Sequence, residues 1–342
     1  MTAPWTPGTA TAMGSLPGND PFEAARTVVG ELPDLPHLPE LPGRGVGADI
    51  IGRGAGLLVD IAVELVPSGY RVTARPGRDH RRAVDLLRTD LDAFEAAVEG
   101  AGSQPPVVKV QSVGPWTLAA SVELHSGHRV ITDSGALREF AASLGEGLRV
   151  HADELSRRLE TRVLVQLDEP SLPDVLAGGI PTPSGYGTVA AVAENDAAEL
   201  LRGVVEQLPG PVIVHCCAPR PPIALLRRAG ADVVAVDAGL LAGAPRTTID
   251  ALGEAWDSGA GVLLGLVPAV EPAVPPTLFD LARPALELVD QLGFPRALLA
   301  QQCVPTPSCG LADATPEWVR TALGRCRELG QAFVDPPDAW AR

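Results

Sequence analysis

Short apolar runs alternate with amphipathic stretches from residue 107 onward, and this alternation limits the fold more than any other feature. The runs are VVKVQS, VLVQLDEP, PVIVHCCAP, DVVAVD, GVLLGLVP and RALLAQQCVP. Helical periodicity follows them over 136–159, 196–207, 221–229, 248–257, 278–291 and 316–332. Because near-continuous apolar strands are typical of parallel sheets buried on both faces, the pattern predicts six consecutive βα units.

The first hundred residues supply two further candidate units. TATAMGS (9–15) precedes a helical stretch at 21–31, and YRVTA (70–74) precedes one at 80–99. Eight units predict an α/β fold of the closed (β/α)8 TIM-barrel type. An open doubly wound sheet is the alternative, but MGSLPGND lacks the G-x-G-x-x-G phosphate turn that such a sheet normally carries. We expect a single domain over 1–342, with a core of about 9–334.

Two Pro-rich stretches interrupt the alternation, ELPDLPHLPELPGRG (31–45) and GGIPTPSGYG (178–187). Repeated proline stiffens a loop and removes sheet donors. Both stretches are therefore predicted to be long ordered loops at the barrel mouth, acting either as rigid surface connections or as a lid.

Composition narrows the function. A formal charge of -15 with scattered Arg argues against nucleic acid, which is held by clustered Lys and Arg. The opening residues have neither a basic start nor an apolar run, so we expect a cytoplasmic protein with no membrane partner and a small-molecule substrate. Five cysteines, two of them adjacent, favour metal or thiol chemistry over disulfides.

In a barrel of this kind the active site gathers at the carboxyl ends of the strands, so polar residues that end an apolar run are the candidates. They are Gly14 and Ser15, Asp168 and Glu169, His215 with Cys216 and Cys217, Asp237, and Cys309.

His215 and Cys217 alternate along a strand, so both side chains are expected on one face and Cys216 on the other. With Cys309 as a third ligand, the set suits tetrahedral zinc with one open position, which is typical of a catalytic site. Asp237 is expected either as a fourth ligand or as a hydrogen-bond acceptor for His215. The alternative, that buried cysteines act only as small apolar residues, is expected for Cys216, Cys303 and Cys326.

Asp168 and Glu169 precede a proline at a strand end, where one of them is expected to bind a substrate ammonium group. The alternative is a carboxylate at a helix N-terminus. The remaining histidines lie in loops or polar stretches and are expected to be solvated: His37, His80, His125, His128 and His151.

The motifs MGSLPG, GPWTL, QLDEPSL, VHCCAP and PSCGL, in that order, resemble the catalytic barrel of the cobalamin-independent methionine synthases, in its single-barrel form. The resemblance implies a zinc ion held by His215, Cys217 and Cys309, with Asp237 where the family has a glutamate. It also implies homocysteine as the thiol substrate, with Gly14, Ser15 and Asp168 holding its amino acid end. A free thiol is mostly protonated at neutral pH and a metal-bound one is not, so zinc would supply the nucleophile.

The departures from the family concern the methyl donor. Leu266 stands where the family has a histidine proton donor, and Gly52 stands where a homocysteine-binding glutamate is expected, with Asp49 nearby as a candidate. Ser121 aligns with a folate-stacking tryptophan, for which Trp116 is the candidate substitute. The full-length enzymes of the family carry an additional barrel that contributes to folate binding. The 342 residues here are expected to form a single barrel, with no room for that additional one.

The sequence therefore predicts a zinc-dependent homocysteine methyltransferase whose donor is either methyltetrahydrofolate or methylcobalamin on a corrinoid protein. The alternatives are a related barrel enzyme of the uroporphyrinogen decarboxylase type and a non-catalytic zinc- or thiol-binding protein.

Overall fold

The computed structural model describes residues 4–337 and 340. The strands are β1 (Ala62–Val66), β2 (Gly69–Thr73), β3 (Val107–Val113), β4 (Val122–Glu123), β5 (Arg162–Asp168), β6 (Val212–His215), β7 (Val233–Asp237), β8 (Gly261–Val267) and β9 (Cys303–Pro307). The helices are α1 (Pro21–Glu31), α2 (Ile50–Leu57), α3 (Arg78–Ala101), α4 (Pro115–Ser121), α5 (Ser134–Leu159), α6 (Leu172–Ala177), α7 (Glu194–Val205), α8 (Ile223–Arg228), α9 (Ala238–Leu241), α10 (Arg246–Asp257), α11 (Leu278–Leu292), α12 (Ala297–Gln302) and α13 (Pro316–Val334). Short 3-10 turns span Pro42–Arg44 and Val130–Thr132.

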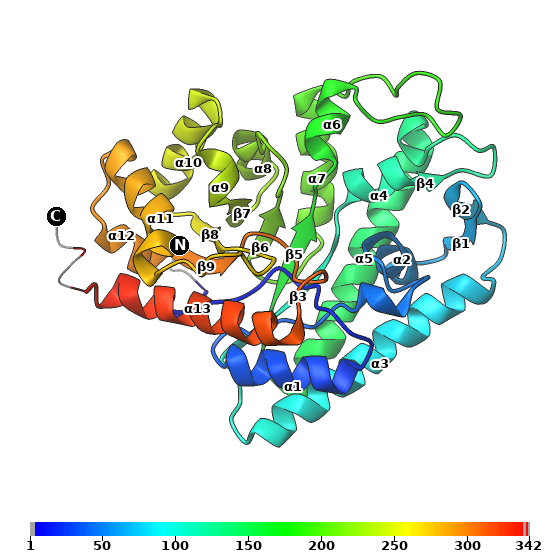
Figure 1. Ribbon diagram of the computed structural model, residues 1–342. Coiled ribbons are helices and arrows are strands. Elements are labelled where there is room, and N and C mark those ends of the chain that lie inside the picture. The colour runs from blue at the N-terminus through cyan, green and yellow to red at the C-terminus, as the bar shows by residue number, and fades with distance from the viewer. Residues whose placement is uncertain (1–3, 338–339, 341–342) are drawn as a thin grey trace.

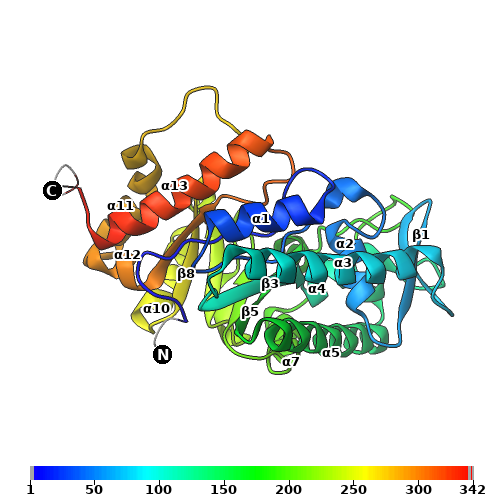
Figure 2. The same ribbon diagram turned by 90° about the horizontal axis from the view of Figure 1, so that it is seen from below.

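A curled parallel sheet forms the centre, with strand order β3-β5-β6-β7-β8-β9. The predicted βα alternation accounts for β3 and for β5 to β8. In the sixth predicted run, RALLAQQCVP, the strong helix formers of Ala297–Gln302 make helix α12 and β9 begins only at Cys303, which corrects that part of the prediction. Helices pack around the outside of the sheet (Figures 1 and 2). The strands are buried almost throughout, because helices cover one face and the barrel interior the other. The register places Asp168 at the end of β5 opposite His215 at the end of β6.

Two irregular segments close the barrel between β9 and β3. One, around residues 11–16, bonds to β9 through Thr11 N and Pro305 O at 3.4 Å. Its other edge meets the second segment, residues 36–40, where Glu40 N donates to Gly14 O at 3.0 Å. That second segment bonds in turn to β3, with Leu38 N donating to Lys109 O at 2.8 Å. These contacts complete eight strand positions and confirm the predicted TIM-barrel class.

The second barrel strand was assigned wrongly from the sequence. YRVTA forms β2, which pairs with β1 in an antiparallel hairpin and with β4 in a small side sheet. The barrel position belongs instead to the Pro-rich stretch 31–45, which is neither a surface connection nor a lid. Its leucines recur every third residue and are all buried: Leu32, Leu35, Leu38 and Leu41. Proline between them removes backbone donors, so the segment enters the sheet through isolated bridges rather than a continuous ladder.

The other Pro-rich stretch, 178–187, does lie on the surface. It follows β5 and α6 and extends away from the barrel, with Tyr186 exposed (Figure 1). Within the described residues, no helix combines the length and apolar character that a bilayer span requires.

The expectation of solvated histidines is wrong for His37 and His151, which are both buried. His37 sits in the closing segment beside Lys109, where burial, reinforced by the lysine charge, lowers its pKa to about 3. His151 lies on α5, where burial, with help from Arg53, lowers its pKa to about 4.

Because His37 is buried and neutral, the folded protein is expected to lose stability in mild acid. The unfolded chain takes up a proton on this residue below about pH 6.5 while the folded chain stays neutral down to about pH 3, so the free energy of unfolding falls with pH across that window. Between pH 7 and pH 5 the wild type should lose about 2 kcal/mol more than His37→Leu in urea unfolding. His125→Leu, at an exposed position, controls for loss of one histidine. Equal losses in the wild type and His37→Leu would contradict the assignment.

Candidate active site

The carboxyl ends of the barrel strands bring most of the predicted residues together. Asp168 Oδ1 lies 2.8 Å from His215 Nδ1. The thiol of Cys217, two residues beyond β6, hydrogen bonds with that of Cys309, two residues beyond β9. Ser15 packs so closely on Gly310 that a Cβ there would lie 2.0 Å from the serine hydroxyl. The cluster thus joins three strand ends and the first closing segment.

His215 has one ring nitrogen engaged and one free. Nδ1 faces Asp168, whereas Nε2 is buried and has no hydrogen-bond partner among the described residues. A carboxylate accepts and does not donate, so this contact places the imidazole proton on Nδ1. The lone pair of Nε2 is then available to a metal, in the usual arrangement of a metal-binding histidine.

The two thiols share their hydrogen bond unequally. Contact with Cys217 lowers the pKa of Cys309, and the nearby His215 and the Gly310 N–H act in the same direction. The same contact, together with burial, raises the pKa of Cys217. One thiolate at this position is therefore accessible before the second.

The other three cysteines behave as buried apolar residues, as expected. Cys216, Cys303 and Cys326 are buried, and burial raises the pKa of each thiol. Cys216 lies near Glu169 and also close enough to Cys217 to help raise its pKa, and the expected alternation of the two side chains stays a prediction because both residues follow the end of β6.

The donor set suits zinc by type, although it is not arranged as a metal cage. In the described part of the chain, no three His, Cys, Asp or Glu side chains are grouped so that they could hold one metal ion. An unpartnered imidazole nitrogen and two thiols are nevertheless the ligand types that zinc takes. Binding would require Cys217 and Cys309 to give up their mutual hydrogen bond.

Asp237 has a different partner from the one expected. Its Oδ1 accepts from Gly239 N at 2.8 Å and so caps the short helix α9. Partial burial raises its pKa, against the opposing effects of the Gly239 and Leu240 N–H groups and then of His215. As a fourth zinc ligand it remains a prediction, since the described conformation commits it to the helix.

Two further expected substrate residues are helix caps in the structure. Glu169 is fully buried and accepts from Trp116 N, Thr117 N and Thr117 Oγ1 at 2.9, 2.8 and 2.7 Å, which anchors the start of α4. Asp49 accepts from Ile51 N and Gly52 N at the start of α2 and also from the Tyr70 hydroxyl. Both oxygens of each carboxylate already accept hydrogen bonds, and a substrate contact by Glu169 or Asp49 stays a prediction.

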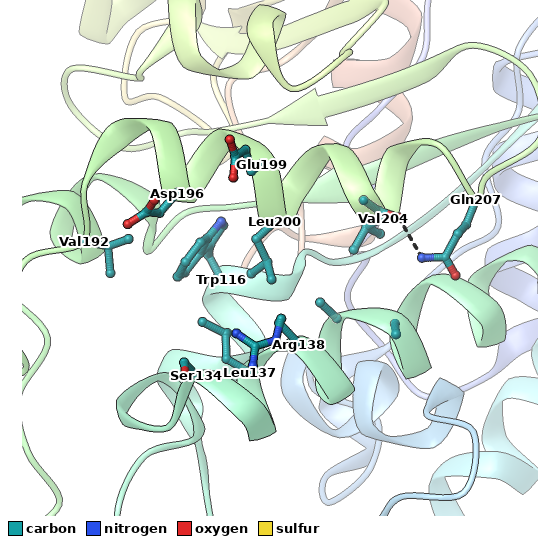
Figure 3. Close-up of a pocket in the computed structure, with 13 residues that line it drawn as sticks. Trp116, Ser134, Leu137, Arg138, Val192, Asp196, Glu199, Leu200, Val204 and Gln207 are labelled. Atoms are coloured by element: carbon teal, nitrogen blue, oxygen red, sulfur yellow. Dashed lines mark hydrogen bonds between the residues drawn. The ribbon is translucent and has the colours of Figure 1, made fainter.

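Trp116 also has a packing role in place of the expected substrate contact. Its indole Nε1 donates to Ala197 O on α7 at 3.0 Å. Figure 3 shows the ring in a groove of about 550 Å³ between α5 and α7, beside Leu137 and Leu200. This groove lies among the outer helices, so the indole does not face the thiol cluster.

The structure adds a carboxylate that the sequence interpretation missed, Glu40. Glu40 is buried in the second closing segment, where its backbone forms an isolated β-bridge with Ser15. Burial raises the pKa of its carboxyl, and the charge of Asp168 raises it further. Arg53 lies 3.4 Å away and lowers that pKa. The family resemblance places a homocysteine-binding glutamate at Gly52, but this position lies so close to Tyr70 and Gly47 that a side chain does not fit there. The leucine-proline repeat contains three acids, Glu31, Asp34 and Glu40, so no sequence signal singled out Glu40.

Arg53 also belongs to a buried ion-pair network behind Glu40. It pairs with Asp90 on α3, and Asp90 pairs with Arg44 at 2.7 Å. Because these groups are almost fully buried, each charge depends on its partner, and the network fixes the guanidinium that faces Glu40.

A TIM barrel with a buried imidazole and two thiols at its mouth is an enzyme scaffold of the thiol-chemistry type, and comparison with known proteins specifies the family. The family described as "Cobalamin-independent synthase, Catalytic domain" matches residues 8–332, so the chain belongs to that family. It is a methyltransferase of the methionine synthase type.

Solved structures agree on the fold. A B12-independent methionine synthase from Shewanella sp. W3-18-1, determined in complex with selenomethionine, has a TM-score of 0.61 and 14% identity, covering 96% of this chain and 98% of that one. A methyltransferase from Methanosarcina mazei has a TM-score of 0.58 and 14% identity, covering 97% and 94%. No curated protein sequence matches significantly.

Glu169 and Asp168 are adjacent in sequence, yet their substitution should have opposite effects. Glu169→Gln turns an amide N–H toward donors, so it should lower the free energy of unfolding by about 1–3 kcal/mol while zinc binding persists. Asp168→Asn should weaken zinc binding with a smaller loss of stability. Urea unfolding and metal analysis separate the two effects. A stable Glu169→Gln protein that has lost zinc would contradict the capping role.

Proposed function

We propose that this chain transfers a methyl group to the thiol of homocysteine, forming methionine, with zinc held by His215, Cys217 and Cys309. The observation that carries the proposal is the buried, unpartnered Nε2 of His215 beside two hydrogen-bonded thiols at the barrel mouth. When bound, zinc would keep the substrate thiol as a thiolate at neutral pH, where a free thiol with a pKa of about 8.5 is mostly protonated.

The chain's own residues would hold the amino acid end of the substrate. Both hydrogen bonds of Asp168 found among the described residues fall on Oδ1, which leaves Oδ2 to accept from an ammonium group. Glu40 supplies a second carboxylate close to Asp168. Two like charges side by side are stabilised by a cation between them, and the substrate ammonium fits that need.

Backbone at the first closing segment would approach the substrate closely. Gly14 has φ of +147° and faces the Gln111 side chain, where an added Cβ would lie 2.7 Å away. Ser15 beside Gly310 connects this segment to Cys309. Any side chain at Gly14 would displace Gln111, which lies next to the carboxylate of Glu40 and near that of Asp168.

The methyl donor in this proposal is either methyltetrahydrofolate or methylcobalamin carried on a corrinoid protein. Leu266 on β8 is a buried apolar residue, so this position offers no proton donor. Trp116 donates a hydrogen bond to Ala197 O on α7, and in this proposal it packs between the outer helices rather than stacking on folate.

The test is methionine formation by zinc-loaded protein given homocysteine with each donor in turn. We expect methionine from at least one donor, and its loss in Cys309→Ser together with the zinc. Cys326→Ala, which removes a buried thiol far along α13, should retain both. Zinc-loaded protein that makes no methionine from either donor would contradict the proposal.

Substitution of Glu40 should affect substrate binding more than the metal. Glu40→Gln removes one charged acceptor for the ammonium, which is worth about 1.5–3 kcal/mol and corresponds to a rise in the homocysteine KM of about 10- to 150-fold. Zinc content and kcat should change little. Glu31→Gln, on the outer helix α1, is the matched control. An unchanged KM in Glu40→Gln would remove this residue from the binding site.

A further inference from the structure

Lys109 is a fully buried ammonium group beneath the active-site cluster. From β3, its Nζ donates to Gln166 Oε1 at 2.7 Å, Met13 O at 3.2 Å and Gln111 Oε1 at 3.3 Å. An ammonium has three N–H donors and no acceptor, so three oxygen atoms satisfy it completely.

This contact determines which way each glutamine amide faces. The ammonium only donates, so it faces the oxygen of the Gln166 amide and the NH2 group of Gln166 points to the opposite side. It donates there to Asp168 Oδ1 at 2.7 Å and to Met13 O at 2.9 Å. Gln111 is oriented in the same way, with its NH2 donating to Leu38 O at 2.7 Å and its amide also bonded to Glu40.

The same chain of donors reaches His215. Asp168 Oδ1 accepts from Gln166, and it also contacts His215 Nδ1 at 2.8 Å. An oxygen that already accepts from an amide and carries no proton requires the imidazole to donate, so Nδ1 is protonated and Nε2 keeps its lone pair. Lys109 fixes the direction of the hydrogen bonds made by Gln166, and Gln166 holds the Asp168 carboxylate in the place from which it orients His215.

We propose that Lys109 is a positioning residue: through Gln166 it holds the Asp168 carboxylate against His215 Nδ1, which leaves Nε2 of the neutral ring free, and through Gln111 it orients Glu40. The tautomer of His215 can be measured without a metal, whereas the effect of that tautomer on zinc binding rests on the proposed function.

The charges of the two carboxylates near Lys109 favour the same arrangement. Burial lowers the pKa of Lys109 to about 8, while Asp168 and then Glu40 act to raise it. The two carboxylates that the glutamines reach are therefore also the charges that favour the protonated lysine.

The test measures the His215 tautomer directly in metal-free protein by nitrogen NMR of labelled imidazole rings, with the signals assigned by their loss in His215→Asn. Lys109→Met removes the donors at similar length, and Gln166→Met breaks the next link. Thr306→Val is the matched control, because Thr306 is equally buried on β9 and its hydroxyl has no partner among the described residues.

The wild type and Thr306→Val should show one protonated nitrogen, Nδ1, and an unprotonated Nε2. Lys109→Met and Gln166→Met should show a mixture of both tautomers, and their zinc affinity in chelator competition should fall by about 10- to 100-fold. If Lys109→Met does not fold, Gln166→Met decides. A folded Gln166→Met protein with the wild-type tautomer would overturn the proposal, whereas a wild type that shows the tautomer but binds no zinc would contradict the proposed function alone.

Discussion

The barrel encloses charged and polar side chains that have to find their partners inside the protein, and both the fold and the site depend on this constraint. A buried charge is costly unless it is paired and hydrogen bonded. Lys109 meets the requirement with three oxygens, and Arg53 meets it with Glu40 and Asp90. His215 Nε2 is among the buried polar atoms without a partner in the described residues, and the proposed function gives this nitrogen to the metal.

The irregular closure of the barrel contributes directly to the site. A regular second strand would turn alternate residues to each face, whereas the leucine-proline repeat buries every third residue on either side. Leu35 packs in the smaller cluster with Leu164 and Ile213, and the other leucines of the repeat belong to the larger core. This period buries the leucines and still admits His37 and Glu40 to the interior. The same segment also accepts the Gln111 amide through Leu38 O, so closure and site share their hydrogen bonds.

The parallel strands and the thiol cluster could be predicted from sequence because both follow from local patterns. Buried strands are continuous apolar runs, and residues that end such runs meet at one edge of a barrel. The closing segment could not be predicted, since proline at every third position hides a strand whose bonds come from distant backbone. YRVTA had better strand propensity but packs in a side sheet, so tertiary context overrode propensity.

The roles of the carboxylates were also harder to predict from the sequence. Asp49 and Asp237 cap the helices that follow them directly, whereas Glu169 caps a helix from a distant part of the chain. For Glu169 the helix it anchors begins more than fifty positions earlier in the chain, where no sequence pattern reveals it. Glu40, by contrast, was missed because its surroundings resembled a loop.

The central claim is that one imidazole and two thiolates at the barrel mouth hold a metal ion. Cobalt(II) added to metal-free protein measures this directly, because thiolate ligands give intense charge-transfer absorption that oxygen and nitrogen ligands lack. The account predicts one cobalt ion per chain with thiolate charge-transfer bands, which diminish in Cys217→Ser and in Cys309→Ser. Cobalt bound without those bands, or bands that survive in both variants, would contradict it.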